Sequence, residues 1–162
     1  MLPIGNLAWQ TAVMPDFDAI RKGFSEAVPF ARTLGIEYLE LSAEHAVVRL
    51  PDRAEQHNHV GGPHAGAMFT LGESATGAIV LASFPDLLAE YTPLAAGAQI
   101  RYRALAMGDV TAEATLARAA ADVRADLARD GRARFDVGVV LRDAAGTVTG
   151  EMSVTWAFRK AG

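Results

Sequence analysis

A cluster of polar residues stands directly before a long apolar segment that contains one acid. The polar cluster is QHNHVGGPH at residues 56–64, and the segment that follows runs from Ala65 to Pro85 with Glu73 as its only charged side chain. Small and apolar residues on every side are typical of a buried helix. A buried carboxylate is costly unless it is paired or used. A polar turn that leads into such a helix therefore predicts an active site in which Glu73 takes part.

Length and composition limit the kinds of protein that this chain can be. It has 162 residues, of which 51% are hydrophobic and 21% are charged, and no repeat or linker, so we expect one globular domain over residues 1–162. A net charge of −4 argues against a nucleic-acid-binding protein, which usually carries a basic stripe. The lack of cysteine excludes disulfides, thiolate metal sites and a cysteine nucleophile, and it is compatible with the cytoplasm.

The apolar segment from Ala65 to Pro85 is not expected to cross a membrane. It is long enough to do so, but Glu73 lies near its middle, where an acid is costly in a bilayer, and no Lys or Arg flanks it. The N-terminus also lacks the basic and sustained apolar stretches of a secretory signal. We therefore expect no membrane partner and a cytoplasmic location.

The first half of the chain predicts one helix, two strands and a loop before the buried helix. Residues 16–34 have apolar side chains spaced for one helix face, and Gly35 ends that helix. Two short strand-like runs follow at 36–41 and 45–50, joined by a polar Ser-Ala-Glu turn. Residues 51–63 form a long polar loop that leads to the buried helix.

The second half of the chain predicts strands. Apolar and polar residues alternate in four consecutive segments, at 98–104, 110–116, 132–141 and 148–159, and a helical turn is expected at 122–129. Such alternation is typical of an antiparallel sheet with one covered face. The fold class is therefore α+β.

A sheet and one fully apolar helix fit together if the sheet curls around the helix. The small residues of the helix favour this arrangement because they let the strands approach closely; they are Ala65, Gly66, Ala67, Gly72, Ala75, Gly77 and Ala78. A sheet of about six strands leaves a free edge, which proteins usually pair or cover. We expect a dimer in which two sheets pair edge to edge.

The polar loop and the acid resemble a known family. Asn58 lies six residues before His64, Ala65 and Gly66 follow that histidine, and Glu73 comes nine residues after it. This pattern resembles the hotdog-fold acyl-CoA thioesterases of the phenylacetate-pathway (PaaI-like) type and the uncharacterised DUF4442-like subgroup. The resemblance covers residues 35–159, with residues 16–34 as an added N-terminal helical segment.

The resemblance implies a fold, a substrate and an assembly. The fold would be the hotdog fold, an antiparallel sheet of about six strands wrapped around a central helix. The substrate would be an acyl-CoA thioester, with no metal and no cofactor beyond the coenzyme A of the substrate. The protein would be a homodimer or homotetramer with its active site at the subunit interface, where the acid of one subunit acts on a thioester held by the other.

The resemblance also implies roles for individual residues. Glu73 would be the general base or nucleophile, and apolar surroundings would raise its pKa. The amides of Ala65 and Gly66, at the positive end of the helix, would hold the thioester oxygen. Asn58 would orient the water or the carbonyl, and His64 would cap or orient the turn. The residues expected to contact the substrate are Gly62, Gly66 and Met68.

The chain departs from the family pattern at three places. Ala65 stands where the family has a glycine, and its methyl group could crowd an approaching carbonyl. Glu73 replaces the usual aspartate. Many relatives have a Ser or Thr at the start of the strand after the helix, where this chain has Ala95 and Ala96. The departures at Ala65 and at Ala95 and Ala96 keep open a non-catalytic alternative, a domain that binds acyl-CoA without cleaving it.

Three further interpretations of the polar residues remain open. Asp52 and His57 have the Asp-x4-His spacing of hotdog enoyl-CoA hydratases. Arg101 and Arg103 could contact the phosphates of coenzyme A, but the sequence favours ordinary solvated arginines. A zinc site has enough possible ligands in His57, His59, His64 and Glu73.

Overall fold

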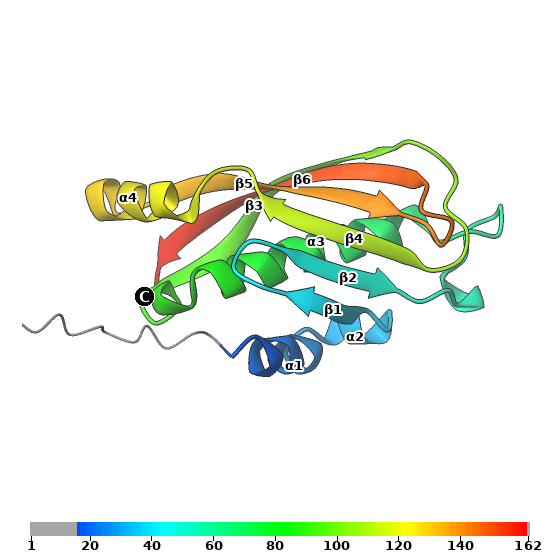
Figure 1. Ribbon diagram of the computed structural model, residues 1–162, viewed down its shortest axis with the longest axis horizontal. Helices are drawn as coiled ribbons and strands as arrows, with labels where there is room; N and C mark the ends of the chain where they lie inside the picture. The colour runs from blue at the N-terminus through cyan, green and yellow to red at the C-terminus, as the bar shows by residue number, and fades with distance from the viewer. Residues whose placement is uncertain (1–15, 162) are drawn as a thin grey trace, which may run out of the picture.

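An antiparallel sheet of six strands curls around one long helix in the computed structural model, which describes residues 16–161 (Figure 1). The strand order is β1-β2-β4-β5-β6-β3, and all neighbours are antiparallel. The predicted α+β architecture is therefore confirmed. The strands are β1 (Glu37–Leu41), β2 (Ala46–Leu50), β3 (Tyr91–Tyr102), β4 (Val110–Leu116), β5 (Ala133–Arg142) and β6 (Val148–Lys160).

The central helix is α3 (Ala65–Ser83), and its sheet-facing side is completely buried. Leu71, Ala75 and Ile79 are each 0% exposed. Gly72 shows why small residues are needed, because a Cβ at this position would lie 2.6 Å from Met152 Sδ on β6. The helix is long and apolar enough to span a bilayer, with a mean hydropathy of 1.3. Here it is the core helix of a soluble-type α+β fold.

The N-terminal helix is divided in two, so the prediction of one continuous helix over residues 16–34 was wrong. Helix α1 (Phe17–Ala27) and helix α2 (Pro29–Thr33) are separated by Val28, whose backbone is not helical (φ −112°, ψ 90°). The cause is Pro29, since a proline disfavours the helical conformation of the residue before it. Gly35, with φ of +68°, ends the second helix as expected.

Strand β3 was predicted to begin at residue 98 but begins at Tyr91. Pro93 and Gly97 hide the first half of the strand in the sequence, because both residues are unusual in central strands. They are tolerated because β3 lies at the edge of the sheet, where proline can be accommodated, and a bulge lies between Ala95 and Gly97. The turn predicted at 122–129 is a full helix, α4 (Ala120–Asp130).

The two edges of the sheet differ in what covers them. Helix α1 lies beside β1 at one edge, and α2 follows α1 there (Figure 1). At the other edge, most residues of β3 are exposed. The edge-to-edge dimer remains a prediction, and β3 is the edge that is available for it.

Candidate active site

Glu73 lies on a side of α3 that the rest of the chain covers only in part. It shares this side with Gly66 and Thr70, which are spaced at i, i+4 and i+7, and none of the three is fully buried. We call these three residues the open face of α3. Glu73 itself is partly buried, and within residues 16–161 no hydrogen bond or ion pair reaches its carboxylate. Burial raises the pKa of the Glu73 carboxyl above its ordinary value.

A tyrosine that the sequence did not indicate lies close to Glu73. Tyr38, on β1, is 6% exposed, and its hydroxyl has no well-formed hydrogen bond among the described residues. Burial raises the pKa of the Tyr38 phenol, the nearby Ser74 hydroxyl partly offsets this rise, and the charge of Glu73 adds to it. Tyr38 is thus a buried polar group beside the acid. Its place in a strand with alternating residues gave no sign of this contact.

Two aromatic rings pack against α3 at Gly77, one helical turn after Glu73. A Cβ at Gly77 would contact Trp156, from β6, at 3.7 Å and Phe24, from α1, at 3.8 Å. Trp156 is held in place because its Nε1 donates a 3.0 Å hydrogen bond to Thr76 Oγ1. Gly77, one helical turn after Glu73, is therefore packed against two aromatic rings.

The first turn of α3 offers one free amide. His64 is the N-cap, and its Nδ1 accepts a 2.9 Å hydrogen bond from the Gly66 N–H. The Ala65 N–H, in contrast, has no partner among residues 16–161 and is exposed. Tyr102 Oη, at the end of β3, donates a 2.8 Å hydrogen bond to the Ala65 carbonyl and fixes the edge strand to the helix start. Of the two amides predicted to bind a carbonyl, only that of Ala65 is available in this structure.

Asn58 holds the loop together through its side chain. Its Oδ1 accepts hydrogen bonds from the Val60 and Gly62 N–H groups at 2.9 and 3.3 Å, and its Nδ2 donates to the Pro63 carbonyl at 3.2 Å. Gly62 packs so closely that a Cβ there would lie 2.3 Å from the Ala106 carbonyl oxygen. The predicted functional residues Asn58 and Gly62 thus shape the turn before α3.

The structure brings Asp52 and His57 together. His57 Nε2 lies 2.6 Å from Asp52 Oδ1, and the Asp52 N–H donates to Asp109 Oδ1 at 2.8 Å. His57 also lines a cavity of about 500 Å³ together with His64 and the first residues of α3. The Asp-x4-His spacing therefore corresponds to a real contact beside the helix start.

Other predicted site residues are placed differently. Met68, predicted to contact the substrate, is 4% exposed and belongs to the core. Arg103 forms an ion pair with Glu151. Within the described part of the chain no group of three or more His, Cys, Asp or Glu residues could hold a metal, so the alternative of a zinc site receives no support from the arrangement of His57, His59, His64 and Glu73.

Glu73 and the Ala65 amide belong to one helix but are not close together. Eight residues separate them, which is about 12 Å along the axis at 1.5 Å per residue. A carboxylate at that distance cannot contact a carbonyl group bound at the start of its own helix. It can act on a carbonyl group held by a second copy of the chain.

A comparison with protein families gives one match to most of the chain. The family described as a domain of unknown function, DUF4442, matches residues 18–158. No curated protein matches the chain.

Solved structures share the fold. A Pseudomonas aeruginosa protein of unknown function, described as a probable thioesterase, has a TM-score of 0.79 and 28% identity, covering 89% of this chain and 95% of that one. The Escherichia coli PaaI protein of the phenylacetic acid degradation operon has a TM-score of 0.69 and 14% identity, covering 90% and 94%. A mutant thioesterase from Pseudomonas aeruginosa has a TM-score of 0.73 and 18% identity, covering 91% and 96%. The fold is that of the hotdog thioesterases.

Proposed function

The chain belongs to the DUF4442 family and has a hotdog fold, and from this premise we propose that it hydrolyses acyl-CoA thioesters to a free acid and coenzyme A. A relative with 28% identity that is described as a probable thioesterase supports hydrolysis as the reaction class. Within that class, the observation that carries the proposal is Glu73. It is a partly buried carboxylate with a raised pKa and no bonding partner among the described residues, on the open face of the central helix.

Glu73 would act as a general base. An acid whose pKa is raised toward neutrality takes a proton from water more effectively than an ordinary carboxylate does. The activated water would add to the thioester carbonyl carbon. The C–S bond would then break, and the proton held by Glu73 would return to the leaving thiolate of coenzyme A.

The start of α3 would polarise the thioester. The free Ala65 N–H lies at the positive end of the helix and can donate to the carbonyl oxygen as negative charge develops there. The Gly66 amide could join it only after the His64 ring turns away, because His64 Nδ1 now accepts from it. Asn58 and Gly62 would contribute by holding the loop that presents this helix end.

A second copy of the chain would complete the site. The axial separation of Glu73 and Ala65 fits a carbonyl held at the helix start of one copy and hydrolysed with Glu73 of another. The exposed edge strand β3 is the surface on which we expect the two copies to pair. We propose a homodimer or a dimer of dimers that acts in the cytoplasm and needs no metal or organic cofactor.

The experiment that tests the proposal is the release of coenzyme A from a panel of short, medium, long and aryl acyl-CoAs, detected with a thiol reagent. The chain contains no cysteine, so the protein adds no thiol signal of its own. We expect turnover on at least one substrate, its loss in Glu73→Gln, and partial activity in Glu73→Asp, which has the family's usual acid.

The non-catalytic alternative makes a different prediction for the same assay. A domain that only binds acyl-CoA would show no turnover on any substrate while still binding a non-hydrolysable acyl-CoA thioether. That result, obtained with a folded oligomer, would reject the thioesterase and leave the binding module.

One observation favours a second candidate function, the hydration of enoyl-CoA. The contact between His57 and Asp52 gives an acid–base pair at a cavity beside the start of α3. Such a pair could activate water for addition to a carbon–carbon double bond conjugated with the thioester. Hydration would be measured as the loss of absorbance of a short enoyl-CoA, and it should depend on His57 and be independent of Glu73.

A further inference from the structure

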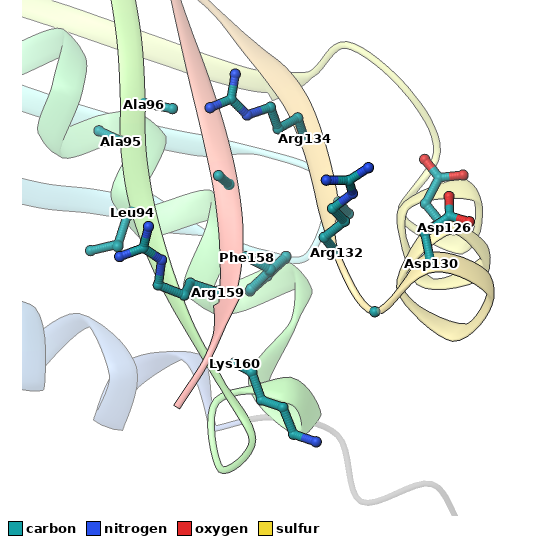
Figure 2. A pocket seen from close by; sticks show the side chains of 13 residues that line it. Leu94, Ala95, Ala96, Asp126, Asp130, Arg132, Arg134, Phe158, Arg159 and Lys160 are labelled. Carbon is teal, nitrogen blue, oxygen red and sulfur yellow. The ribbon is translucent and has the colours of Figure 1, made fainter. Parts of the chain in front are cut away.

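A second, larger cavity lies on the outer face of the sheet, away from the open face of α3. Its volume is about 890 Å³, and it is formed where the start of β5, the end of β6, the first half of β3 and helix α4 meet (Figure 2). The side chains that face it alternate with those that fill the core. Arg134 is exposed, for example, while Ala133 and Phe135 on either side are buried.

Four cationic side chains line this cavity. They are Arg132, Arg134, Arg159 and Lys160, and none of them forms an ion pair or a side-chain hydrogen bond within residues 16–161. Most arginines elsewhere are paired, as Arg49 is with Glu37 and Arg124 with Asp86. The whole chain has a net charge of −4, so this concentration of free positive charge is local.

The acids in the cavity do not cancel this charge, because other arginines already neutralise them. Asp126 accepts from Arg118 at 2.7 Å and from Arg129 at 2.9 Å, and Asp130 accepts from Arg129 at 2.8 Å. The Arg118 guanidinium, and after it Arg129, hold the pKa of the Asp126 carboxyl below its usual range. Arg132, Arg134 and Arg159 are therefore left to meet an anion from outside, whereas Lys160 points away from them (Figure 2).

The floor of the cavity is apolar. The strand register places Arg134 beside Ala157, and Ala157 beside Leu94, in one row across β5, β6 and β3. Leu94 is 45% exposed at this place. An apolar strip next to free guanidinium groups suits a ligand that combines a flat or apolar body with phosphate, since arginine binds phosphate in a bidentate manner. The volume lies within the range of small-molecule sites, roughly 300–1,000 Å³.

We propose that this cavity binds an adenosine phosphate, namely the nucleotide end of a coenzyme A thioester. The inference rests on the proposed function for the identity of the substrate. It also fits the expected assembly. If two β3 strands pair in antiparallel fashion, the first half of one strand, with Leu94, lies opposite the second half of the other, which ends at the helix start through Tyr102. The cavity of one copy would then lie on the outer face of the joined sheet, next to the half of the neighbour's β3 that Tyr102 joins to the α3 start.

The test measures nucleotide binding directly, without turnover. Isothermal titration calorimetry would compare coenzyme A, adenosine 3′,5′-bisphosphate, ADP and inorganic phosphate on the full chain. We expect coenzyme A and the bisphosphate to bind, and the double variant Arg132→Gln/Arg134→Gln to raise their Kd at least tenfold. The matched control is Arg142→Gln, which changes an exposed arginine on the same face of β5 but at the other end of the strand; it should leave Kd within twofold.

Each outcome supports or overturns the proposal. Equal binding of coenzyme A to the wild type and the double variant would reject the cavity, as would an equal loss in Arg142→Gln. If ADP binds as well as the bisphosphate does, the site is a general adenine-nucleotide site and the link to coenzyme A is overturned. Because binding is measured apart from hydrolysis, a chain that binds the bisphosphate but turns over no acyl-CoA would reject only the thioesterase. In an active enzyme, the double variant should raise KM and leave kcat unchanged.

Discussion

The loop of residues 51–64 and the open face of α3 meet at the start of the helix, and their polar groups differ in how they are bonded. In the loop, Asn58 bonds to three backbone groups, His57 bonds to Asp52, and His64 bonds to the Gly66 amide. On the helix face, Glu73 has no bonding partner among the described residues although burial raises its pKa. The polar side chains of the loop therefore form the hydrogen bonds that fix its conformation.

This difference identifies where reactivity is expected. A polar group that is already bonded contributes to structure, and removing its partner costs stability. A partly buried carboxylate without a partner is unfavourable for stability, and such perturbed groups gather at functional sites. The loop positions the helix start and Glu73 supplies the chemistry, so substitutions in the loop should change stability and a substitution at Glu73 should change turnover.

The largest effect should come from Glu73→Gln. Replacing the base by an amide of equal size should lower kcat roughly 10²- to 10⁴-fold, the usual contribution of general acid–base catalysis. Glu55→Gln, in the loop, is the matched control because Glu55 is exposed and paired with Arg53; it should keep kcat within twofold. Steady-state release of coenzyme A measures both variants. Equal losses in the two would remove the distinction between helix face and loop.

The next effect should be structural and should come from the loop. Gly62→Ala places a Cβ 2.3 Å from the Ala106 carbonyl oxygen, which is backbone and cannot turn aside. Overpacking of this kind costs about 1–3 kcal/mol. Urea denaturation should therefore show a lower free energy of unfolding for Gly62→Ala. Gly138→Ala is the control, because a Cβ at residue 138 meets nothing within 4 Å. An unchanged midpoint for Gly62→Ala would show that the loop can move away from residue 106.

The same contrast explains how much the sequence revealed. Glu73 is the one acid in an apolar segment, so the buried helix and the position of Glu73 on it could be predicted from the sequence. Alternation gave the strands β4, β5 and β6 to within a residue or two. The packing of Phe24 and Trp156 at Gly77 could not be predicted, because these two residues lie far apart in sequence and meet only through the fold.

Other features were hidden for local reasons. Pro93 and Gly97 concealed the first half of β3, since their tolerance depends on the strand lying at an edge. The contact between Asp52 and His57 was visible only as a common spacing. The free amide of Ala65 and the occupied amide of Gly66 look equivalent in the sequence, because the difference depends on the rotation of the His64 ring.

A smaller effect should appear in the pH dependence of stability. Because burial raises the Glu73 pKa in the folded state, the folded chain holds this proton more tightly than the unfolded chain does. The stability that the folded chain gains by holding this proton is fully present below about pH 4.5, the ordinary pKa of a glutamate. It is lost as the pH rises through the raised pKa of Glu73. As the pH rises from 4 to 8, the urea midpoint of the wild type should therefore decrease relative to that of Glu73→Gln. A wild type that gains stability relative to the variant over this range would show that Glu73 is paired when charged.

The smallest effect should come from the pair of Asp52 and His57. Both side chains are partly exposed, Asp52 by 42% and His57 by 28%, and contacts of this kind near the surface contribute about 0–1 kcal/mol. For a thioesterase that uses Glu73, His57→Gln should change kcat less than threefold and should lower stability only slightly. Asp52→Asn should behave in the same way, since it keeps the side-chain size and a hydrogen bond to the ring. A loss of kcat approaching that of Glu73→Gln would instead move the acid–base chemistry from the helix face to the loop and favour hydration of a double bond. His57→Gln and Asp52→Asn thus decide whether the pair of Asp52 and His57 only stabilises the loop or carries out the acid–base chemistry itself.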